Sequence, residues 1–433
     1  MALKPSLSAR VLAGPGAERR RSRSRLLTVA CLLTLAMWLR YQHSVQLAFS
    51  SSGSSGSSST ASTAAAAAAV DDGGGAVGGS ADVDSGSTGG TSADSSGGLM
   101  QPIDKGKSLQ FDVCNGFTNQ RIALMSGLVL AAETNRSVVL PDWLLNGYLA
   151  DSKTFVSAGS NNSVPFEAWF RPQAFAQALA AHGVRVAAGK AAQPWDVLIK
   201  RFDSQSQTNA LISFLRKKRA RQHLNIHPCP AFRMPGALMA RHKNLLQAAA
   251  AALQPAQRFA GLIEARRAEI ATKTGSQGFN LLHVRVEKDW LKLCEWYQNP
   301  AEGRDNCMNN TDTVGQQLLR HGFDTEVPLV VTTSFPDAVP DLLQQVLASI
   351  SGSGYRAVLG SELAAGSGLS REESALVDYY LALQAGRFIG NSVSTFTAFI
   401  ILERSWLGRF SRHYNGGNVP LELFLPFYDA SNS

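Results

Sequence analysis

The chain has 433 residues, of which 45% are hydrophobic and 17% charged, and its formal net charge is +8. This composition is typical of one large or two ordinary globular domains and excludes a protein that is disordered throughout. Residues 1–49 hold eight basic residues and one acid, which leaves 33 basic and 32 acidic residues in the rest of the chain. The positive charge therefore belongs to the N-terminal segment, and we expect no nucleic-acid partner for the folded body.

An apolar segment near the N-terminus predicts entry into the secretory pathway. Residues 1–25 form a basic tail, and residues 26–39 (LLTVACLLTLAMWL) are apolar apart from two threonines. A basic cluster stays on the cytoplasmic side, so the chain that follows the apolar run crosses the membrane. The run suits a short signal-anchor or a cleaved signal peptide. We expect a single-pass type II protein of the Golgi or ER membrane with a luminal body, or alternatively a protein secreted after cleavage.

Residues 50–99 predict a disordered stem, because they contain Ser, Gly, Ala and a few Asp and no aromatic residue. The Asp-x-Asp pattern Asp82–Asp84 lies within this stem and is the only one in the chain. Many sugar-nucleotide enzymes hold a divalent cation with this pattern, but inside a coil we interpret it as chance. We therefore predict no metal site.

The body, from about residue 108 to residue 431, alternates predicted strands with predicted helices. This alternation predicts parallel sheets covered on both faces. Two such regions flank a more helical, Ala-rich middle, which predicts an α/β protein with two Rossmann-like domains, 108–270 and 271–431, that face each other across a cleft. Ligands are expected at the carboxyl ends of the strands. The predicted strands are 108–114, 137–140, 184–187, 280–286, 328–332, 356–359 and 387–390, and the predicted helices are 119–134, 337–347, 371–385 and 395–403.

Four cysteines in the body favour disulfide bonds, because an even number beyond a membrane signal is typical of an oxidising compartment. Cys294 and Cys307 flank a polar loop and are paired, and Cys114 is then paired with Cys229 by elimination. The chain has no Cys/His pattern typical of zinc. Three asparagines begin N-glycosylation sequons, and the first of them ends a predicted helix: Asn135, Asn161 and Asn309.

The segment Gly116–Arg121 (GFTNQR) joins a predicted strand to a predicted helix. A glycine turn at a helix N-terminus offers backbone N–H groups to an anion. Asn119 either caps the helix or contacts a ligand. Arg121 is equally compatible with a solvent-exposed position.

The segment His283–Trp290 (HVRVEKDW) ends a predicted buried strand. Strand alternation places His283, Arg285 and Glu287 on one side of it. Three ionisable groups on a buried strand are costly unless they are paired or used in function. Two interpretations stay open, an internal Arg–Glu salt bridge and an arginine that binds a diphosphate at the end of the strand.

The segment Phe388–Phe396 (FIGNSVSTF) runs from a short apolar strand into hydroxyl residues that begin a helix. Ser394 and Thr395 are predicted to be the N-cap and a first-turn residue. Ordinary capping explains them, and phosphate contacts through hydroxyl and N–H groups are the functional alternative.

Taken together with the tail Tyr414–Pro426 (YNGGNVPLELFLP), these segments make residues 108–428 resemble the GDP-fucose O-fucosyltransferase family, in its plant and algal branch. The resemblance implies a GT-B-like fold and inverting transfer of fucose from GDP-fucose to a hydroxyl of a protein or glycan acceptor. It implies no cofactor and no obligatory metal. Related plant enzymes use UDP-rhamnose, so a rhamnosyltransferase or another 6-deoxyhexosyl transferase is the alternative enzyme.

The same resemblance implies roles for individual residues. Arg285 would hold the β-phosphate and the leaving oxygen, and His283 would support that arginine or the nucleotide. Since inversion needs a base on the opposite face of the sugar, Glu287 is either that base or the partner that orients Arg285. A catalytically inactive secretory module that binds sugar or protein is the alternative from another class, and ionisable residues on a buried strand argue against it. The other implied contacts with the GDP-sugar are Gly116, Asn119, Asp378, Ser394, Thr395 and Phe396.

Overall fold

The computed structural model describes residues 100–102, 106–147, 162–191, 194–198, 205–218, 221–227, 236–288 and 313–415. The chain divides into two units, 1–89 and 90–433, and all described residues belong to the second. The predicted anchor, almost all of the predicted stem and the Asp82–Asp84 pattern therefore lie outside the described residues. Within the described ranges no helix is both long and apolar enough to span a membrane.

The first half of the unit is built on a parallel six-stranded sheet in the order β1-β6-β3-β2-β8-β7. Its strands are β1 (Met100–Pro102), β2 (Ser108–Phe111), β3 (Ser137–Val138), β6 (Val186–Ala188), β7 (Trp195–Leu198) and β8 (His223–His227). Around it lie α2 (Phe117–Thr134), α3 (Pro172–Ala180), α4 (Gln205–Lys217) and the antiparallel pair β4 (Trp143–Leu144) and β5 (Ser163–Val164).

The second half is built on a parallel five-stranded sheet in the order β11-β10-β9-β12-β13. Its strands are β9 (Asn280–His283), β10 (Leu329–Thr332), β11 (Ala357–Leu359), β12 (Phe388–Gly390) and β13 (Ser411–His413). Every residue of β9, β10 and β12 is buried, as expected for a parallel sheet covered on both faces. The helices are α9 (Val314–Arg320), α10 (Pro340–Gly352), α11 (Arg371–Gln384) and α12 (Thr395–Trp406).

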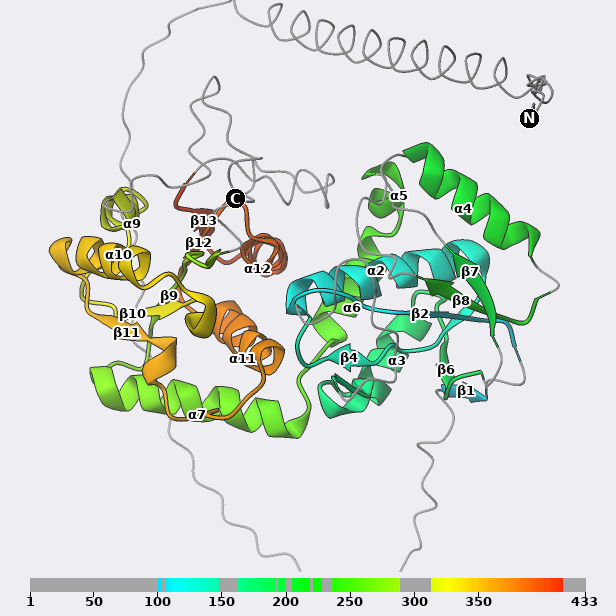
Figure 1. The fold of residues 1–433 in the computed structure, drawn as a ribbon, viewed down its shortest axis with the longest axis horizontal. Helices are drawn as coiled ribbons and strands as arrows, with labels where there is room; N and C mark the ends of the chain where they lie inside the picture. The colour runs from blue at the N-terminus through cyan, green and yellow to red at the C-terminus, as the bar shows by residue number, and fades with distance from the viewer. Residues whose placement is uncertain are drawn as a thin grey trace, which may run out of the picture. The chain divides into compact units, whose positions relative to one another are not determined.

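Three further helices connect the sheets: α5 (Gly236–Arg241), α6 (Lys243–Ala252) and α7 (Gln257–Thr274). Helix α6 packs against α3, and α7 packs against α11, beside which it runs in Figure 1. The prediction of two Rossmann-like α/β halves is thus confirmed.

Each sheet has a point at which the order of its strands reverses. In the second sheet the chain starts at β9, proceeds outward through β10 and β11, and returns to the other side of β9 with β12. In the first sheet β1 lies at the edge beside β6; from β2 the chain proceeds through β3 to β6, and it later adds β7 and β8 on the other side of β2, with β8 next to β2. Loops at the carboxyl ends of two such neighbouring strands diverge and leave a ligand crevice. The topology therefore predicts two ligand crevices, one at the carboxyl ends of β9 and β12 and one at the carboxyl ends of β2 and β8.

Helix α2 joins the two halves, because it packs against α11 and α12. Arg121 of α2 is fully buried, forms an ion pair with Glu403 of α12, and donates a hydrogen bond of 3.1 Å to the hydroxyl of Tyr380. Its guanidinium also lies 4.6 Å from the ring centre of Tyr379. The interpretation of Arg121 as a solvent-exposed residue is therefore wrong, because α2 is buried between the halves and exposes little of its surface.

Candidate functional site

His283 ends β9 at the first of these positions. Its Cα partner on the neighbouring strand β12 is Gly390, and its Nδ1 atom lies 2.9 Å from the hydroxyl oxygen of Thr397. The imidazole ring centre lies 4.7 Å from that of Phe396. Burial, with the nearby charge of Arg285, lowers the pKa of His283 to about 3. The side chain is therefore a neutral imidazole at physiological pH. A neutral side chain does not repel the nearby Arg285 cation.

Arg285 and Glu287 follow β9 but do not belong to it. The predicted strand 280–286 ends at His283, because the neighbouring strands β10 and β12 also end at that level and offer no further partner. The prediction of one strand that carries all three ionisable residues is wrong to that extent. The two residues still meet, since Arg285 Nε lies 3.6 Å from Glu287 Oε2, and the Arg–Glu pair is confirmed.

The carboxylate of Glu287 is held on its other side by the end of β10. Its Oε1 atom accepts hydrogen bonds of 3.2 Å from the hydroxyl of Thr333 and from the N–H of Ser334. Its Oε2 atom, which faces Arg285, has no hydrogen-bond partner among the described residues. Glu287 is thus fixed toward Arg285, which favours the orienting role over the role of base.

The loop between β12 and α12 presents the N-terminus of a 12-residue helix beside His283. Ser394 is the N-cap residue, as predicted, but its side chain makes no capping hydrogen bond, so ordinary capping does not explain it. Asn391 fixes the loop, because its amide donates to the hydroxyl of Tyr414 at 3.0 Å and accepts from the N–H of Val393 at 2.9 Å. Thr395 and Phe396 follow Ser394 and are partly exposed.

Gly390 allows the close contact of β12 with α12. A Cβ atom at this position would lie 2.4 Å from the hydroxyl oxygen of Thr397 and 2.7 Å from its methyl carbon. We expect Gly390→Ala to push Thr397 away from His283 and to destabilise the fold by about 1–3 kcal/mol. The control is Gly352→Ala, where nothing lies within 4 Å of the new carbon. Thermal unfolding of both variants tests this, and an equal Tm in both would contradict the packing account.

The depressed pKa of His283 predicts a dependence of stability on pH. The unfolded histidine takes up a proton near its ordinary pKa of 6.5, whereas the native one does so only at about 3. The unfolded state therefore binds more protons below pH 6.5, and the free energy of unfolding falls as the pH falls. When the pH falls from 7 to 5, we expect the free energy of unfolding of His283→Gln to decrease by roughly 2 kcal/mol less than that of the wild type.

Urea unfolding at these two pH values measures this difference. His182→Gln, at an exposed position of the first half, is the matched control and should keep the wild-type dependence. The same pH dependence in His283→Gln and in the wild type would show that His283 titrates normally in the native state.

Two residues predicted to contact the ligand, Gly116 and Asn119, lie at the start of α2. Gly116 is the N-cap residue of α2, so the interpretation of Asn119 as the cap is wrong. The amide oxygen of Asn119 is buried and has no hydrogen-bond partner among the described residues. The first amide of the helix is already bound, because Phe117 N–H donates to Glu372 Oε2 at 2.5 Å. The N–H of Gly147 donates to the other oxygen of this carboxylate at 3.3 Å.

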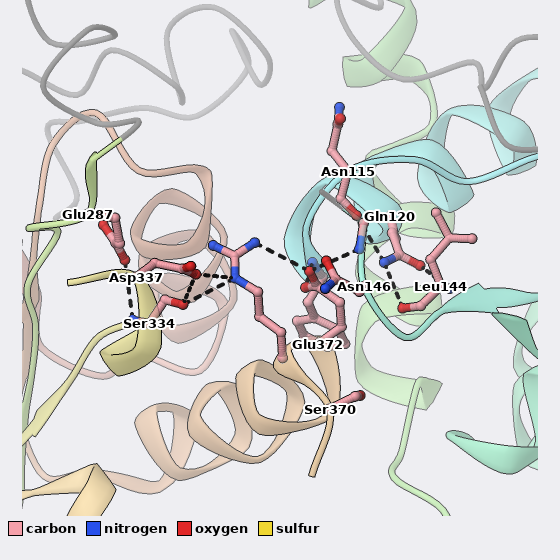
Figure 2. Close-up of polar contacts among 12 residues, drawn as sticks. Asn115, Gln120, Leu144, Asn146, Glu287, Ser334, Asp337, Ser370 and Glu372 are labelled. Carbon is pink, nitrogen blue, oxygen red and sulfur yellow. Dashed lines mark hydrogen bonds and ion pairs between the residues drawn. The ribbon is translucent and has the colours of Figure 1, made fainter. Parts of the chain in front are cut away.

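A chain of polar contacts links this turn to Glu287 (Figure 2). From Ser334, which donates to Glu287, it passes to Arg371, whose Nε lies 3.1 Å from the Ser334 hydroxyl and 2.8 Å from Asp337 Oδ2. Arg371 Nη1 lies 3.6 Å from Glu372 Oε1, and burial raises the pKa of Glu372. Sequence reasoning missed this chain. The available signal was the hydroxyl pair directly after the predicted strand 328–332.

Asp378 lies on α11 and forms a buried ion pair, in which Arg266 Nη1 of α7 donates to Asp378 Oδ1 at 2.5 Å. Burial raises the pKa of Asp378 to about 6 although the arginine opposes this shift. The ion pair explains why a carboxylate is tolerated on this helix. The predicted contact of Asp378 with guanine stays a prediction.

Several predicted covalent features lie partly or wholly outside the described residues. Cys114 is disulfide-bonded, and its predicted partner Cys229 lies outside them. The pairing of Cys114 with Cys229 stays a prediction. Asn135 ends α2 and is exposed. The remaining predicted positions cannot be placed, because they lie outside the described ranges: Cys294, Cys307, Asn161 and Asn309.

The described ranges contain no group of three or more His, Cys, Asp or Glu side chains that could hold a metal ion.

Comparison with known proteins gives one family. The sequence model of the family described as GDP-fucose protein O-fucosyltransferase matches residues 109–407. O-fucosyltransferase 23 of Arabidopsis thaliana is 29% identical over 168 residues, which are 36% of this chain and 37% of the relative. The chain therefore spans little more than a third of that relative's length.

Two solved fucosyltransferase structures are also similar. A crystal structure of POFUT1 in complex with GDP has 16% identity and a TM-score of 0.48, with 73% of this chain and 99% of that chain covered. The fucosyltransferase NodZ from Bradyrhizobium has 17% identity and a TM-score of 0.39, with 69% and 93% covered.

Proposed function

The chain belongs to the GDP-fucose protein O-fucosyltransferase family, and from this premise we propose that it transfers fucose from GDP-fucose to a hydroxyl of a protein or glycan acceptor, with inversion at the anomeric carbon. The observation that carries the proposal is the meeting of Arg285, neutral His283 and the N-terminus of α12 at the strand-order reversal of the second sheet. This is where open α/β sheets bind nucleotides.

In this proposal the arginine takes up the charge that develops on the leaving diphosphate. Its Nε faces Glu287, which aims the guanidinium without a hydrogen bond between the two. Ser394 and Thr395 add backbone and hydroxyl groups at a positive helix end. Fixed donors of this kind supply several kcal/mol of transition-state stabilisation in a site that excludes water. We propose that the reaction needs no metal ion, because Arg285 and α12 supply the positive charge.

His283 and Phe396 have supporting roles in the same proposal. The imidazole stays neutral near Arg285, so it holds Thr397 in place without repelling the cation. The ring of Phe396 contacts that of His283 and also that of Tyr379, whose ring centre is 5.7 Å away in an edge-to-face arrangement. Because Phe396 is partly exposed, we propose that its free surface flanks the nucleotide.

We further propose that the protein works in the lumen of the Golgi or the ER as a type II membrane protein. The apolar run 26–39 behind a basic tail supports this location. The disulfide at Cys114 supports it independently, because such bonds persist in oxidising compartments.

A donor panel tests the proposed activity. The purified full-length chain is incubated with GDP-fucose, UDP-rhamnose and other sugar nucleotides, and nucleoside diphosphate release is measured. We expect release from GDP-fucose, and NMR spectroscopy should show the α-anomer as the first sugar product. Release from UDP-rhamnose alone would assign the chain to rhamnose transfer. Tight nucleotide binding without release from any donor would indicate an inactive binding module.

A further inference from the structure

The strand-order reversal of the first sheet carries a second cluster of chemistry. Asp112 directly follows β2, and His227 is the last residue of the neighbouring strand β8. Asp112 Oδ2 lies 2.6 Å from His227 Nδ1. The pair thus lies where the topology leaves a crevice in the first half, just as Arg285 and His283 do in the second.

The pair belongs to a row of polar side chains on one face of β2, β8 and β7. Alternation along β2 and β8 sends the apolar residues Leu109 and Ile226 into the core. The polar residues that alternate with them lie on the opposite face and meet across the strands. For example, the hydroxyl oxygen of Ser108 lies 2.9 Å from Nδ1 of His223. Near the carboxyl end, the amide of Asn225 donates to Asp196 Oδ1 at 3.1 Å.

Two oxygen atoms beside the pair are unused. Asn225 is 7% exposed, and its Oδ1 atom has no hydrogen-bond partner among the described residues. Gln110 of β2 is the Cα partner of Asn225 on β8. Its Oε1 atom is also buried and has no hydrogen-bond partner among the described residues. Buried acceptors without donors are costly unless a ligand supplies them. A ligand rich in hydroxyl groups has the donors that these oxygens lack.

The two ring nitrogens of His227 have different neighbours. With Nδ1–H directed to Asp112, the other nitrogen Nε2 is the proton acceptor. Nε2 now faces the side-chain amide of Asn225 and lies 3.3 Å from Asp196 Oδ1. The imidazolium formed by protonation would therefore lie between two carboxylates. The side chain is 27% exposed, so an acceptor and solvent can reach it.

The cluster lies on the edge of the first half that contacts the second. Phe117, five residues beyond Asp112, donates its N–H to Glu372 of α11. Glu372 belongs to the polar chain that leads to Glu287 and Arg285. In the second half Glu287 is engaged by Thr333, Ser334 and Arg285, and Nδ1 of His283 is engaged by Thr397. Protonation of either group would disturb Arg285, because Glu287 would lose the charge that faces the arginine and His283 would gain a charge beside it.

We propose that Asp112 and His227 form the general base that deprotonates the acceptor hydroxyl, and that Gln110 and Asn225 bind neighbouring hydroxyls of a carbohydrate acceptor. This inference rests on the proposed function. The hydroxyl oxygen attacks the anomeric carbon of fucose as its proton passes to His227 Nε2. The bond from the anomeric carbon to the β-phosphate oxygen breaks, its electron pair leaves with GDP, and His227 later releases the proton to water.

Azide provides a test without knowledge of the acceptor. Water must lose a proton to attack GDP-fucose, whereas azide attacks the same carbon with no proton to lose and gives fucosyl azide and GDP. For the full-length chain we expect His227→Ala to lower GDP release in water by about 10²–10⁴-fold. With saturating azide the variant should release GDP within a few-fold of the wild type. Asp112→Asn should show the same pattern with a smaller loss.

His223→Ala is the matched control, because it removes a histidine from the same face of β8 at the other end of the strand. It should keep both reactions. GDP release in water at the wild-type rate in His227→Ala would overturn the proposed base. Loss of the azide reaction in that variant would also overturn it, because general damage to the protein would then explain the loss of both reactions. Absence of GDP release in the wild type with either nucleophile would instead refute the proposed function itself.

Discussion

Replacing Arg285 by alanine is expected to lower the turnover of GDP-fucose by about 10²–10³-fold, because one fixed donor to the leaving group is lost. Arg285→Lys should fail nearly as badly. Lysine keeps the charge but lacks the planar fork that binds two phosphate oxygens at once. Binding of GDP itself should weaken less than turnover, because the contact strengthens as charge develops on the leaving oxygen.

Three measurements on the same protein separate catalysis from folding: turnover, GDP affinity and Tm. Loss of Arg285 leaves the buried carboxylate of Glu287 without its cation, although Thr333 and Ser334 still donate hydrogen bonds to it, so a decrease of Tm is expected. Arg412→Ala, at a partly exposed arginine of β13, is the matched control and should keep turnover. Near-normal turnover in Arg285→Ala would remove the basis of the mechanism. A collapsed Tm would instead mark the Arg285–Glu287 pair as mainly structural.

Removing Arg121 is expected to destabilise the whole body by about 3–5 kcal/mol, because it leaves a buried carboxylate without its cation. Glu403 is 6% exposed, and burial raises its pKa although Arg121 opposes the shift. Arg121→Met therefore tests a contact between α2 and α12 that joins the two halves. Urea unfolding measures the free-energy change.

Two further variants identify the cause of that loss. The double variant Arg121→Met, Glu403→Leu should recover most of the stability, since two apolar side chains leave no unpaired charge. Arg258→Ala breaks an ion pair whose arginine is 60% exposed, and it should cost less than about 1 kcal/mol. A loss in Arg121→Met no larger than that in Arg258→Ala would contradict the account.

The fold class was predictable because several strands and helices, above all in the second half, have strong hydrophobic patterns. The predicted helix 371–385 matches α11, and the predicted strand 387–390 matches β12, within one residue at each end. Strands β7 and β8 were missed. Each is short and alternates polar with apolar residues inside a segment that its alanine content marks as helical. The pairing of β8 with β2 and of β7 with β8 is non-local and leaves no trace in any of these segments alone.

The candidate site was predictable where a motif lies next to a strand end. His283, Arg285 and the Ser394–Phe396 helix start do meet, because β9 and β12 are neighbours in the sheet. The residues that hold them were not predictable. Glu372 reaches the N-terminus of α2 from a helix 255 residues away, and the Asp112–His227 contact spans 115 residues. Such contacts depend on strand order and register, which local patterns do not specify.

A crystal structure of the chain with GDP is the most direct test of the central claim. We predict that the β-phosphate lies within hydrogen-bond distance of the Arg285 guanidinium and of the first turn of α12, with Phe396 against the nucleotide. Glu372 should stay on the N–H of Phe117, because the diphosphate does not need that helix end. A diphosphate bound away from Arg285, with the arginine still directed at Glu287, would contradict the account.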